Sequence, residues 1–255
     1  MDIKKIKSDS SVIARNIIYF ENIDSTNSVA KTKPYENGTL IIADTQSNGK
    51  GRMGREWISE KNSGIYMTYV LIPEIPAERI NILTLVAGLS VCEALNKMYP
   101  VSFKIKWPND IVAEGKKVCG ILTEGVISQT ESKAIVGIGI NVNNRCFPDD
   151  LKQKATSLYL LTEQISEREK IIHKISDIFE KNYLDFLSGK PFMEKYEKLC
   201  VNINQEIAAI KDNTEIRATA IGLTDAGELI IKKEDGTTLN INSGEVSVRG
   251  IYGYY

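Results

Sequence analysis

Histidine and cysteine are scarce in this sequence, and each scarcity excludes a class of site. His173 is the only histidine, so a zinc site with several histidine ligands is excluded, and a Ser-His-Asp triad would have to use this one residue. The four cysteines, Cys92, Cys119, Cys146 and Cys200, form no Cys-x-x-Cys pair, which argues against a zinc or iron–sulfur cage. We expect them to be buried free thiols in a reducing compartment.

The sequence also lacks an excess of charge of one sign and a long apolar run. Lysine and arginine number 32 against 33 aspartates and glutamates, so the formal net charge is −1 and a whole-molecule nucleic-acid binder is not expected. The apolar stretch at 80–92 is too short to cross a bilayer, and residues 1–20 contain no apolar core of a signal peptide. These absences predict a cytoplasmic protein with no membrane contact.

Apolar residues are plentiful enough for a large core. Of 255 residues, 42% are hydrophobic, and a chain of this length buries roughly 70–75% of its unfolded surface. Apolar periodicity predicts an α+β fold, and short strands between glycine turns after about residue 200 predict a small β-barrel-like module. Strands are expected at 15–23, 39–46, 64–73, 110–126 (a hairpin) and 133–143, and helices at 77–98 and 164–187. His173 falls outside the apolar stripe of the second helix, so we expect it to be solvated.

The most informative segment is residues 49–57, Gly-Lys-Gly-Arg-Met-Gly-Arg-Glu-Trp, here called the basic glycine loop. Lys50, Arg52 and Arg55 alternate with three glycines, which let the backbone approach a ligand closely. The cations suit a phosphate or a carboxylate; a solvated basic turn and a nucleic-acid-binding loop are the alternatives. The segment is neither a Walker A loop nor a dinucleotide fingerprint, because Gly-Lys-Ser/Thr is missing and a strand rather than a helix follows.

Two more segments favour ligand contact without specifying the ligand. Pro108 projects Asn109 and Asp110 from the end of a strand, where they would hold a hydrated magnesium ion or form an ordinary polar turn. Gly137 and Gly139 interrupt a strand, where either a flat ring such as adenine or a closely packed helix would lie against the backbone.

Taken together and in order, these segments resemble the biotin protein ligase family, whose members attach biotin to the carrier domain of a carboxylase. The resemblance covers nearly the whole chain. The matching segments are Asp24-Ser25-Thr26-Asn27, Gln46 with Gly49 to Trp57, Lys106-Trp107-Pro108-Asn109-Asp110, Lys117 to Leu122, Gly137 to Asn141, and Gly244 to Arg249.

The resemblance implies both a fold and a reaction. Residues 1–202 would form a catalytic domain with a central mixed β-sheet and helices, like the class II synthetase and lipoate ligase core, and residues 203–255 an SH3-like β-barrel. Biotin and ATP, with Mg²⁺, would form biotinyl-5′-AMP. A lysine on the biotin carboxyl carrier protein of acetyl-CoA carboxylase, or of a related biotin-dependent carboxylase, would then take the biotinyl group. The resemblance is compatible with a homodimer.

The resemblance also assigns roles to single residues by their place in the matching segments. Lys117, Arg52 and Asp110 would be catalytic, Asp110 by orienting or deprotonating the carrier lysine. Biotin would be bound by Ser25, Thr26, Asn27, Gln46, Gly49, Lys50, Gly51, Arg52, Lys117 and Gly120. ATP would be bound by Arg55, Trp57, Lys106, Asn109, Asn141 and Arg249, and Asn109 is also the candidate magnesium ligand.

Two differences from relatives bear on these expectations. Lys50 stands where the family usually has arginine, which keeps the charge but loses the bidentate fork and puts retention of the adenylate in doubt. Only 23 residues precede Asp24, too few for the helix-turn-helix domain that some members carry, so we expect no DNA binding.

Two other functions compete with the ligase interpretation. A lipoate–protein ligase shares the core and the adenylate chemistry, but the basic glycine loop and the C-terminal module disfavour it. A non-catalytic nucleic-acid or regulatory binder is the alternative from another class, and it would show salt-sensitive binding without pyrophosphate release.

Overall fold

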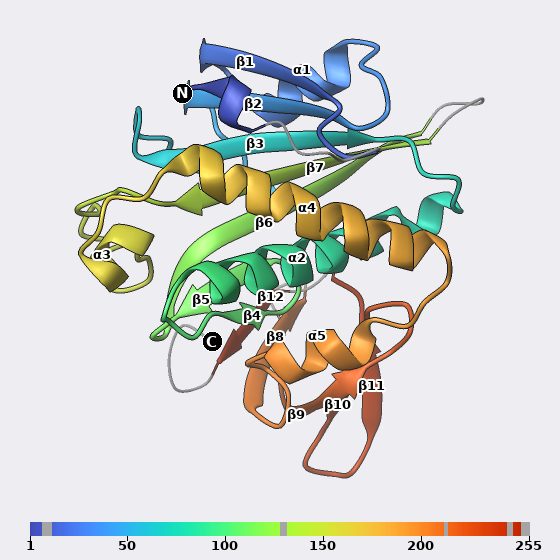
Figure 1. The fold of residues 1–255 in the computed structure, drawn as a ribbon. Coiled ribbons are helices and arrows are strands. Elements are labelled where there is room, and N and C mark those ends of the chain that lie inside the picture. Colours follow the sequence, from blue (N-terminus) through green and yellow to red (C-terminus); the bar gives the residue numbers. More distant parts are fainter. Residues whose placement is uncertain (7–11, 128–131, 212–213, 244–246, 251–255) are drawn as a thin grey trace.

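The computed structural model describes the chain apart from residues 7–11, 128–131, 212–213, 244–246 and 251–255 (Figure 1). Two β-sheets and several helices make up the described part. The helices are α1 (Thr26–Thr32), α2 (Leu83–Met98), α3 (Leu158–Thr162), α4 (Arg168–Leu187) and α5 (Met193–Leu199), with 3-10 turns η1 (Ile3–Lys5), η2 (Arg52–Gly54) and η3 (Ala77–Ile82). The strands are β1 (Asn16–Ile23), β2 (Thr39–Gln46), β3 (Gly64–Leu71), β4 (Lys104–Lys106), β5 (Asp110–Ala113), β6 (Lys116–Ile127), β7 (Ser132–Asn141), β8 (Glu206–Lys211), β9 (Thr214–Leu223), β10 (Leu229–Lys232), β11 (Thr238–Ile241) and β12 (Ser247–Gly250).

The larger sheet is mixed and has the order β1-β2-β3-β7-β6-β5-β4. Only its first pair, β1 and β2, is parallel; the remaining pairs are antiparallel. Strand β3 pairs with β7 over its whole length, from Gly64 opposite Asn141 to Leu71 opposite Ala134. This pairing places residues 24–57 beside residues 117–139, although the two segments are far apart in the sequence.

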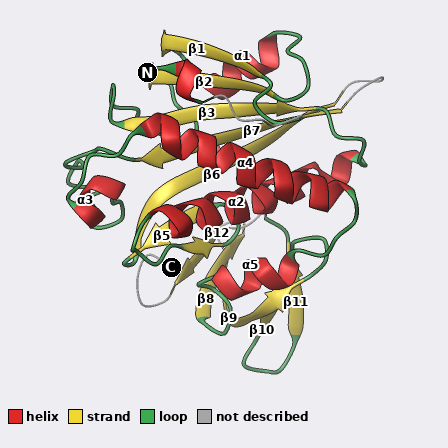
Figure 2. Cartoon of the chain, in the orientation of Figure 1, coloured by secondary structure: helices red, strands yellow, loops and turns green. Residues whose placement is uncertain are grey.

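The two faces of this sheet are covered differently. Helices α2 and α4 lie across one face (Figures 1 and 2), where Tyr69 of β3 meets Phe179 of α4 edge to face at 5.1 Å and its hydroxyl lies 2.8 Å from Ser176. The neighbouring residue of the strand points the other way, so Val70 packs with Ala30 of the short helix α1. Part of this second face is therefore left open beside α1.

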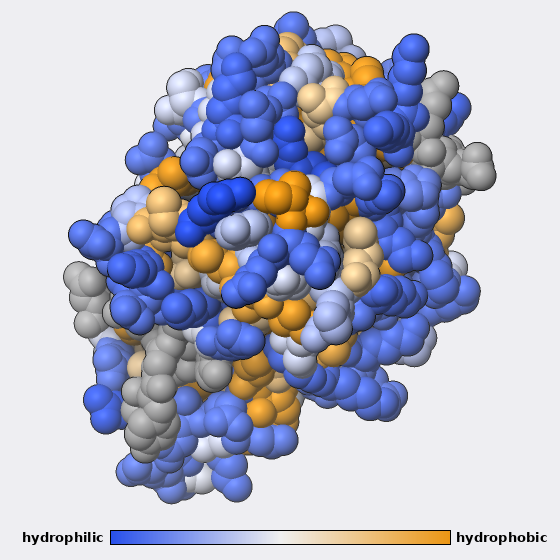
Figure 3. All heavy atoms as spheres, turned by 60° about the vertical axis from the view of Figure 1, so that its left-hand side comes forward, coloured by the Kyte–Doolittle hydropathy of each residue, from blue (hydrophilic) through white to orange (hydrophobic). Residues whose placement is uncertain are grey.

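Residues 77–98 are long and apolar enough to cross a membrane by length and composition alone. In the fold, 72% of the most apolar window is buried inside the protein, as expected of a core helix. The distribution of hydrophobic side chains on the surface is consistent with an apolar helix that is buried in the core. The side of the molecule shown in Figure 3 is mostly hydrophilic, and its hydrophobic side chains form smaller patches between polar ones.

The second sheet is antiparallel and has the order β11-β10-β9-β8-β12. Its inward residues, including Ile207 and Leu229, belong to the same apolar core as the larger sheet. Trp107 connects the two parts, because its Nε1 donates to Gly227 O at 3.0 Å and its backbone N to Asn202 Oδ1 at 2.8 Å. The prediction of an α+β fold with a central mixed sheet and a small C-terminal β module is confirmed.

Several local predictions are corrected by the structure. The helix expected at 164–187 begins at Arg168, because Glu163 adopts a left-handed conformation (φ 58°) that ends the preceding helix α3. Helices α3 and α5 were not predicted, since five- and seven-residue helices show too little apolar periodicity. The first six residues of the helix expected at 77–98 form the 3-10 turn η3.

The thiol and histidine predictions hold in part. Cys92, Cys119 and Cys200 are free and buried, and burial raises the pKa of each thiol. Cys146 is exposed, contrary to the expectation of four buried thiols, because it follows β7 in an irregular segment on the surface. The His173 side chain is 41% exposed and its Nε2 lies 3.4 Å from Asp177, but its Nδ1 is buried, so the predicted solvated position holds only in part.

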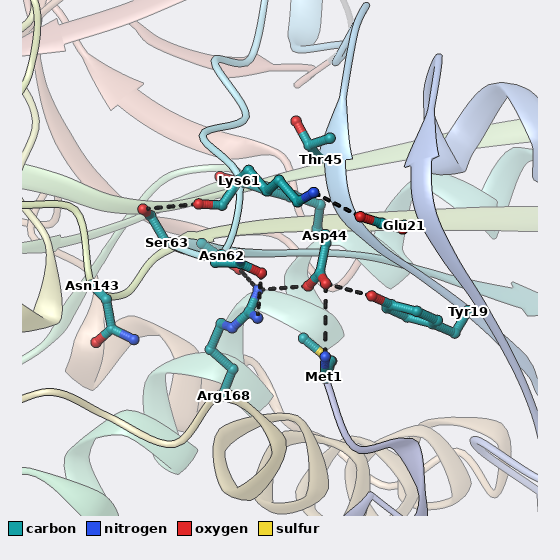
Figure 4. Close-up of polar contacts among 12 residues, drawn as sticks. Met1, Tyr19, Glu21, Asp44, Thr45, Lys61, Asn62, Ser63, Asn143 and Arg168 are labelled. Carbon is teal, nitrogen blue, oxygen red and sulfur yellow. Dashed lines mark hydrogen bonds and ion pairs between the residues drawn. The ribbon is translucent and has the colours of Figure 1, made fainter.

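A buried ion pair ties the N-terminal half of the larger sheet to helix α4 (Figure 4). Asp44 of β2 is 4% exposed, and its Oδ1 lies 2.9 Å from Arg168 Nη1. The Tyr19 hydroxyl donates a short hydrogen bond to the other carboxylate oxygen, which raises the pKa of Tyr19 to about 12. Arg168 also donates to Gly64 O at 3.1 Å. The pair therefore fixes α4 against the start of β3.

This cluster predicts how stability depends on pH. Burial pushes the pKa of Asp44 up, but the Tyr19 hydrogen bond and the Arg168 charge outweigh it, and the net pKa is lowered. A lowered pKa means that the carboxylate contributes stability above the unfolded value near 4, and that this contribution is lost as the pH falls through the folded value. We expect Asp44→Asn to lower the free energy of unfolding by about 1–3 kcal/mol at pH 7.

Urea unfolding of the wild type and the variant between pH 2.5 and 7 measures this difference. We expect the difference in free energy of unfolding between the wild type and Asp44→Asn to become smaller below about pH 4. Asp150→Asn, at an exposed position, serves as the matched control and changes stability little at any pH. If this difference were the same at pH 7 and pH 3, it would contradict the stabilising role assigned to the ionised Asp44.

Candidate functional site

Three glycines leave part of the open sheet face without side chains. Gly120 of β6 pairs with Gly139 of β7, and Gly137 lies two residues before Gly139 on the same strand. A Cβ at Gly137 would lie 2.2 Å from Asn27 Oδ1, and a Cβ at Gly139 would lie 2.5 Å from the indole of Trp57. The backbone of this bare strip, defined by the three glycines, is therefore in direct contact with other side chains.

Side chains of the chain itself lie against these strand glycines. The indole of Trp57 lies on Gly139, and helix α1 places Asn27 on Gly137, as the prediction of a closely packed helix requires. Gly120 contacts the same indole, since a Cβ there would lie 2.8 Å from its ring and 2.9 Å from Lys117 Nζ.

A cavity of about 450 Å³, its open mouth included, lies over the bare strip. The lining residues are Ser25, Thr26, Asn27, Gln46, Lys50, Gly51, Arg52, Trp57, Tyr66, Met67, Asn109, Lys117, Gly120, Ile121, Leu122, Gly137, Ile138 and Gly139. They include three cations, and within the described part of the chain they include no carboxylate.

Uncharged polar groups gather where α1 begins. Ser25 caps the helix by accepting from Ser28 N at 3.4 Å, which brings Thr26 and Asn27 to the sheet. Thr26 N donates to Gln46 Oε1 at 2.8 Å, and the Thr26 hydroxyl oxygen lies 3.1 Å from the same atom. These groups form a buried polar end of the cavity.

Positive charge gathers at the other end of the bare strip. Lys117 Nζ lies 2.7 Å from Asp110 Oδ1 and 5.3 Å from the centroid of the Trp57 ring. Gly120 is in register with both Asp110 and Gly139, which places Lys117 beside Gly139. Two strand residues, about 7 Å, separate Gly139 from Gly137 at the polar end.

The basic glycine loop folds back on itself as a hairpin above the strip. Trp57 N donates to Gly49 O at 2.9 Å, and Gly51 N donates to Arg55 O at 2.7 Å. The turn needs positive φ at Met53 (55°) and Gly54 (72°). A Cβ at Gly49 would lie 2.4 Å from Trp57 O, so glycine is required for this close approach.

Arg52 extends from the loop toward the smaller sheet. Its Nη1 donates to Asn109 Oδ1 at 2.8 Å, and its Nη2 makes a short hydrogen bond to Ser243 O. Burial lowers the pKa of Arg52, an effect that Asp110 opposes. The guanidinium remains charged, because an arginine pKa stays far above neutral pH.

Trp57 carries an unused donor within the cavity lining. Its Nε1 is buried, and it has no hydrogen-bond partner among the described residues. A buried donor without a partner costs about 1–3 kcal/mol. An acceptor on a bound ligand would satisfy it.

Some predicted site residues do not reach the cavity. Asn141 donates to Thr156 O at 3.1 Å and is absent from the lining. Lys106 is 8% exposed and in register with Asp110, and it does not line the cavity either. Arg55 is exposed and faces a second hollow outside the loop, lined by residues 48–56 with Leu122 and Glu124. The backbone of Arg249 lies in β12, but its side chain and residues 244–246 lie outside the described residues.

The structure does not fit the predicted magnesium site at Asn109. Its Oδ1 accepts from Arg52, and its Nδ2 donates to Ile121 O at 3.0 Å. Asp110 is paired with Lys117. The described residues contain no group of three or more His, Cys, Asp or Glu side chains placed to hold a metal.

Two residues at the polar end were missed by the sequence analysis. Thr68 of β3 is fully buried, and its hydroxyl oxygen lies 2.8 Å from Thr26 Oγ1 and 2.7 Å from Asn27 Oδ1. Glu124 of β6 accepts from Asn27 Nδ2 at 2.9 Å. The only signal for Thr68 was a polar residue inside an otherwise apolar strand.

Comparison with known proteins shows which families and relatives the chain is similar to. The profile of the biotin/lipoate A/B protein ligase family matches residues 19–141, and that of the biotin protein ligase C-terminal domain matches residues 203–249. The bifunctional ligase/repressor BirA of Bacillus spizizenii is 36% identical over 89% of this chain and 72% of its own length. The biotin–[acetyl-CoA-carboxylase] ligase of Paracoccus denitrificans is 30% identical over 84% of this chain and 92% of its own.

A solved structure agrees with these matches. The biotin protein ligase of Aquifex aeolicus in complex with biotin and ATP superposes with a TM-score of 0.82 at 35% identity, covering 92% of this chain and 99% of that one.

The bare strip predicts a change in tryptophan fluorescence. Gly139→Ala introduces a methyl group 2.5 Å from the Trp57 indole, so we expect the ring to be expelled and its emission to shift to longer wavelength. The matched control is Gly125→Ala on β6, where a Cβ would meet Ile80 at an ordinary 3.6 Å. The same Gly139→Ala change in a Trp57→Phe background leaves the emission of Trp107 unchanged. An unshifted spectrum for Gly139→Ala alone would contradict the packing.

Proposed function

The chain belongs to the biotin protein ligase family and has biotin protein ligase activity, and we propose that it forms biotinyl-5′-AMP over the bare strip before passing the biotinyl group to a carrier lysine. A cavity with uncharged polar groups at one end, Lys117 at the other, and Lys50 and Arg52 also in its lining suits a ligand with a polar head and an anionic tail. This observation carries the proposal, because biotin has a ureido head, an apolar ring and chain, and a carboxylate.

The polar end supports biotin over lipoate. Thr26, Asn27 and Gln46 supply hydrogen-bonding groups that a ureido ring satisfies. The dithiolane ring of lipoate has no N–H or carbonyl and makes no hydrogen bond with these groups. Sites built to hydrogen-bond a polar group reject analogues that lack it by about 10⁴-fold or more.

The cationic end supports the first half-reaction. A biotin carboxylate oxygen attacks the α-phosphorus of ATP, the bond from that phosphorus to the bridging oxygen breaks, and pyrophosphate leaves. Two unit charges 4 Å apart repel by about 4 kcal/mol at an effective dielectric near 20. We assign Lys117, Arg52 and Lys50 to offset this repulsion and the charge that develops on the phosphoryl oxygens. Asp110 holds Lys117 in place through their 2.7 Å contact.

ATP is assigned to the side of the cavity nearest Trp57. The unpartnered indole Nε1 would donate to a nucleotide oxygen, and Arg52 would exchange Asn109 and Ser243 for phosphate oxygens. Magnesium would enter with the ATP phosphates as part of the substrate, since the described residues contain no group of three or more His, Cys, Asp or Glu side chains placed to hold it. The basic glycine loop would keep water from the adenylate.

The second half-reaction requires access for a protein lysine. The amine of the carrier lysine attacks the acyl carbon, the bond from that carbon to the phosphate oxygen breaks, and AMP leaves. The second hollow shares Lys50, Gly51, Arg52 and Leu122 with the lining of the cavity, and we assign the approach of the carrier lysine to it. The name of the Paracoccus relative points to acetyl-CoA carboxylase as the source of the carrier.

Pyrophosphate release with ATP, magnesium and either acid tests the choice of substrate. We expect biotin to support release and lipoate to be slower on the order of 10⁴-fold at equal concentration. Transfer is then measured as mass added to a purified biotin carboxyl carrier domain. Equal rates with the two acids, or labelling of a carrier by lipoate alone, would contradict the assignment.

Lys117 is the residue on which the first step depends most. We expect Lys117→Ala to lower the rate of biotin-dependent pyrophosphate release by at least about 100-fold, the size of effect seen when one donor to a developing oxyanion is lost. Lys116→Ala is the matched control, because the neighbouring lysine does not line the cavity. Near-wild-type turnover by Lys117→Ala would remove Lys117 from the reaction.

A further inference from the structure

A β-bulge interrupts β6 immediately before the bare strip. Ile111 of β5 is in register with Cys119 of β6. The next residue of β5, Val112, is in register with Lys117, so Val118 is an extra residue in β6. In a regular ladder the side chain of Lys117 would point to the same side as Cys119, which is fully buried in the core. The bulge turns Lys117 to the other side of the sheet.

This bulge accounts for the position of Lys117 over the bare strip. A Cβ at Gly120 would lie 2.9 Å from Lys117 Nζ, and the same nitrogen lies 2.7 Å from Asp110 Oδ1. Asp110 and Gly120 are in register with each other, so all three residues share one face. A bulge disrupts the hydrogen bonds of the ladder, and the main-chain groups of Lys117 therefore need partners from elsewhere in the chain.

Those partners come from residues 154–156, here called the strap. Strand β7 ends at Asn141, and beyond that point the strap pairs with β6 through a parallel β-bridge. Lys117 N donates to Lys154 O at 2.8 Å, and Thr156 N donates to Lys117 O at 2.9 Å. The strap therefore bonds both main-chain polar groups of Lys117.

Asn141 ties the strap to the end of β7. Its Nδ2 donates to Thr156 O at 3.1 Å. Asn141 is 8% exposed and Thr156 is 5% exposed, so water cannot readily replace this bond. Asn141 lies two residues after Gly139 on the same face of the sheet, but it does not line the cavity. Its amide therefore acts on Lys117 through the strap.

We propose that Asn141 is a positioning residue that holds the strap on the bulge and thereby keeps Lys117 Nζ over the bare strip. The inference rests on the proposed function, which assigns Lys117 to the charge that develops on the phosphoryl oxygens. Without the Asn141 amide, Thr156 O loses its donor, the strap moves away from β6, and Lys117 is displaced. A displacement of about 1 Å in a catalytic group can cost on the order of 10²-fold in rate.

The test is a cycle of Asn141→Ala and Lys117→Ala, each alone and the two combined. The rate of biotin-dependent pyrophosphate release is measured at saturating biotin and ATP, together with the half-saturating ATP concentration. We expect Asn141→Ala to lower the rate at least about 10-fold in the wild type and by no more than about 2-fold in Lys117→Ala, where no lysine remains to be displaced. The half-saturating ATP concentration stays within about 3-fold of the wild-type value.

Asn143→Ala is the matched control. Asn143 also holds a segment that follows β7, because it donates to Ser166 O at 3.1 Å and accepts from Ser166 N at 2.9 Å. Within the described part of the chain it has no hydrogen bond to the strap. We expect Asn143→Ala to keep the rate within about 3-fold of the wild type.

A second variant reaches the strap without changing Asn141. Thr156→Pro removes the N–H that Lys117 O accepts, so we expect the same dependence on Lys117, and it keeps the test available if Asn141→Ala does not fold. Thr156→Ala retains this N–H and keeps most of the wild-type rate.

Equal fold-losses in the wild-type and Lys117→Ala backgrounds would overturn the inference, because they indicate general damage to the fold. A raised half-saturating ATP concentration at an unchanged maximal rate would also overturn it, because it indicates that Asn141 contacts the nucleotide. A wild-type chain that releases no pyrophosphate with biotin would contradict the proposed function, and the inference with it.

Discussion

The site depends on a strip of β-sheet that has no side chains. Where β6 and β7 pair, Gly120, Gly137 and Gly139 leave the backbone bare, and a Cβ added at any of the three would lie between 2.2 and 2.8 Å from the nearest side chain above it. Even a methyl group would therefore collide there. Because nothing intervenes, Asn27, Trp57 and Lys117 reach the sheet itself. The buried polar end, the cationic end and the space between them all follow from this close approach.

The two ends divide the chemistry between recognition and charge stabilisation. In the proposed reaction, uncharged groups at the start of α1 would hold the polar head, and Lys117 with the arginine and lysine of the basic glycine loop would face the carboxylate and the phosphate. The loop is closed as a hairpin, with Arg52 bonded to Asn109 and Ser243. Ligand binding would exchange these contacts for phosphate oxygens, which couples the smaller sheet to the first reaction step.

The sequence was most informative where chemistry and spacing coincide in one segment. The basic glycine loop could be predicted because its glycines and cations lie within nine residues, and the α+β fold because its strands and two long helices are strongly periodic. Thr68 and Glu124 could not, because they reach Asn27 only through the pairing of β3 with β7 and of β7 with β6. Lys106 and Asn141 lie in matching segments and share the face of the three glycines, but neither belongs to the cavity lining.

A crystal structure of the chain with biotinyl-5′-AMP tests the central claim most directly. The account predicts the ureido ring against Thr26 and Gln46, and the acyl phosphate within about 3 Å of Lys117 Nζ, with the basic glycine loop above both. An adenylate bound in the hollow outside the loop, with Lys117 still paired only with Asp110, would contradict it.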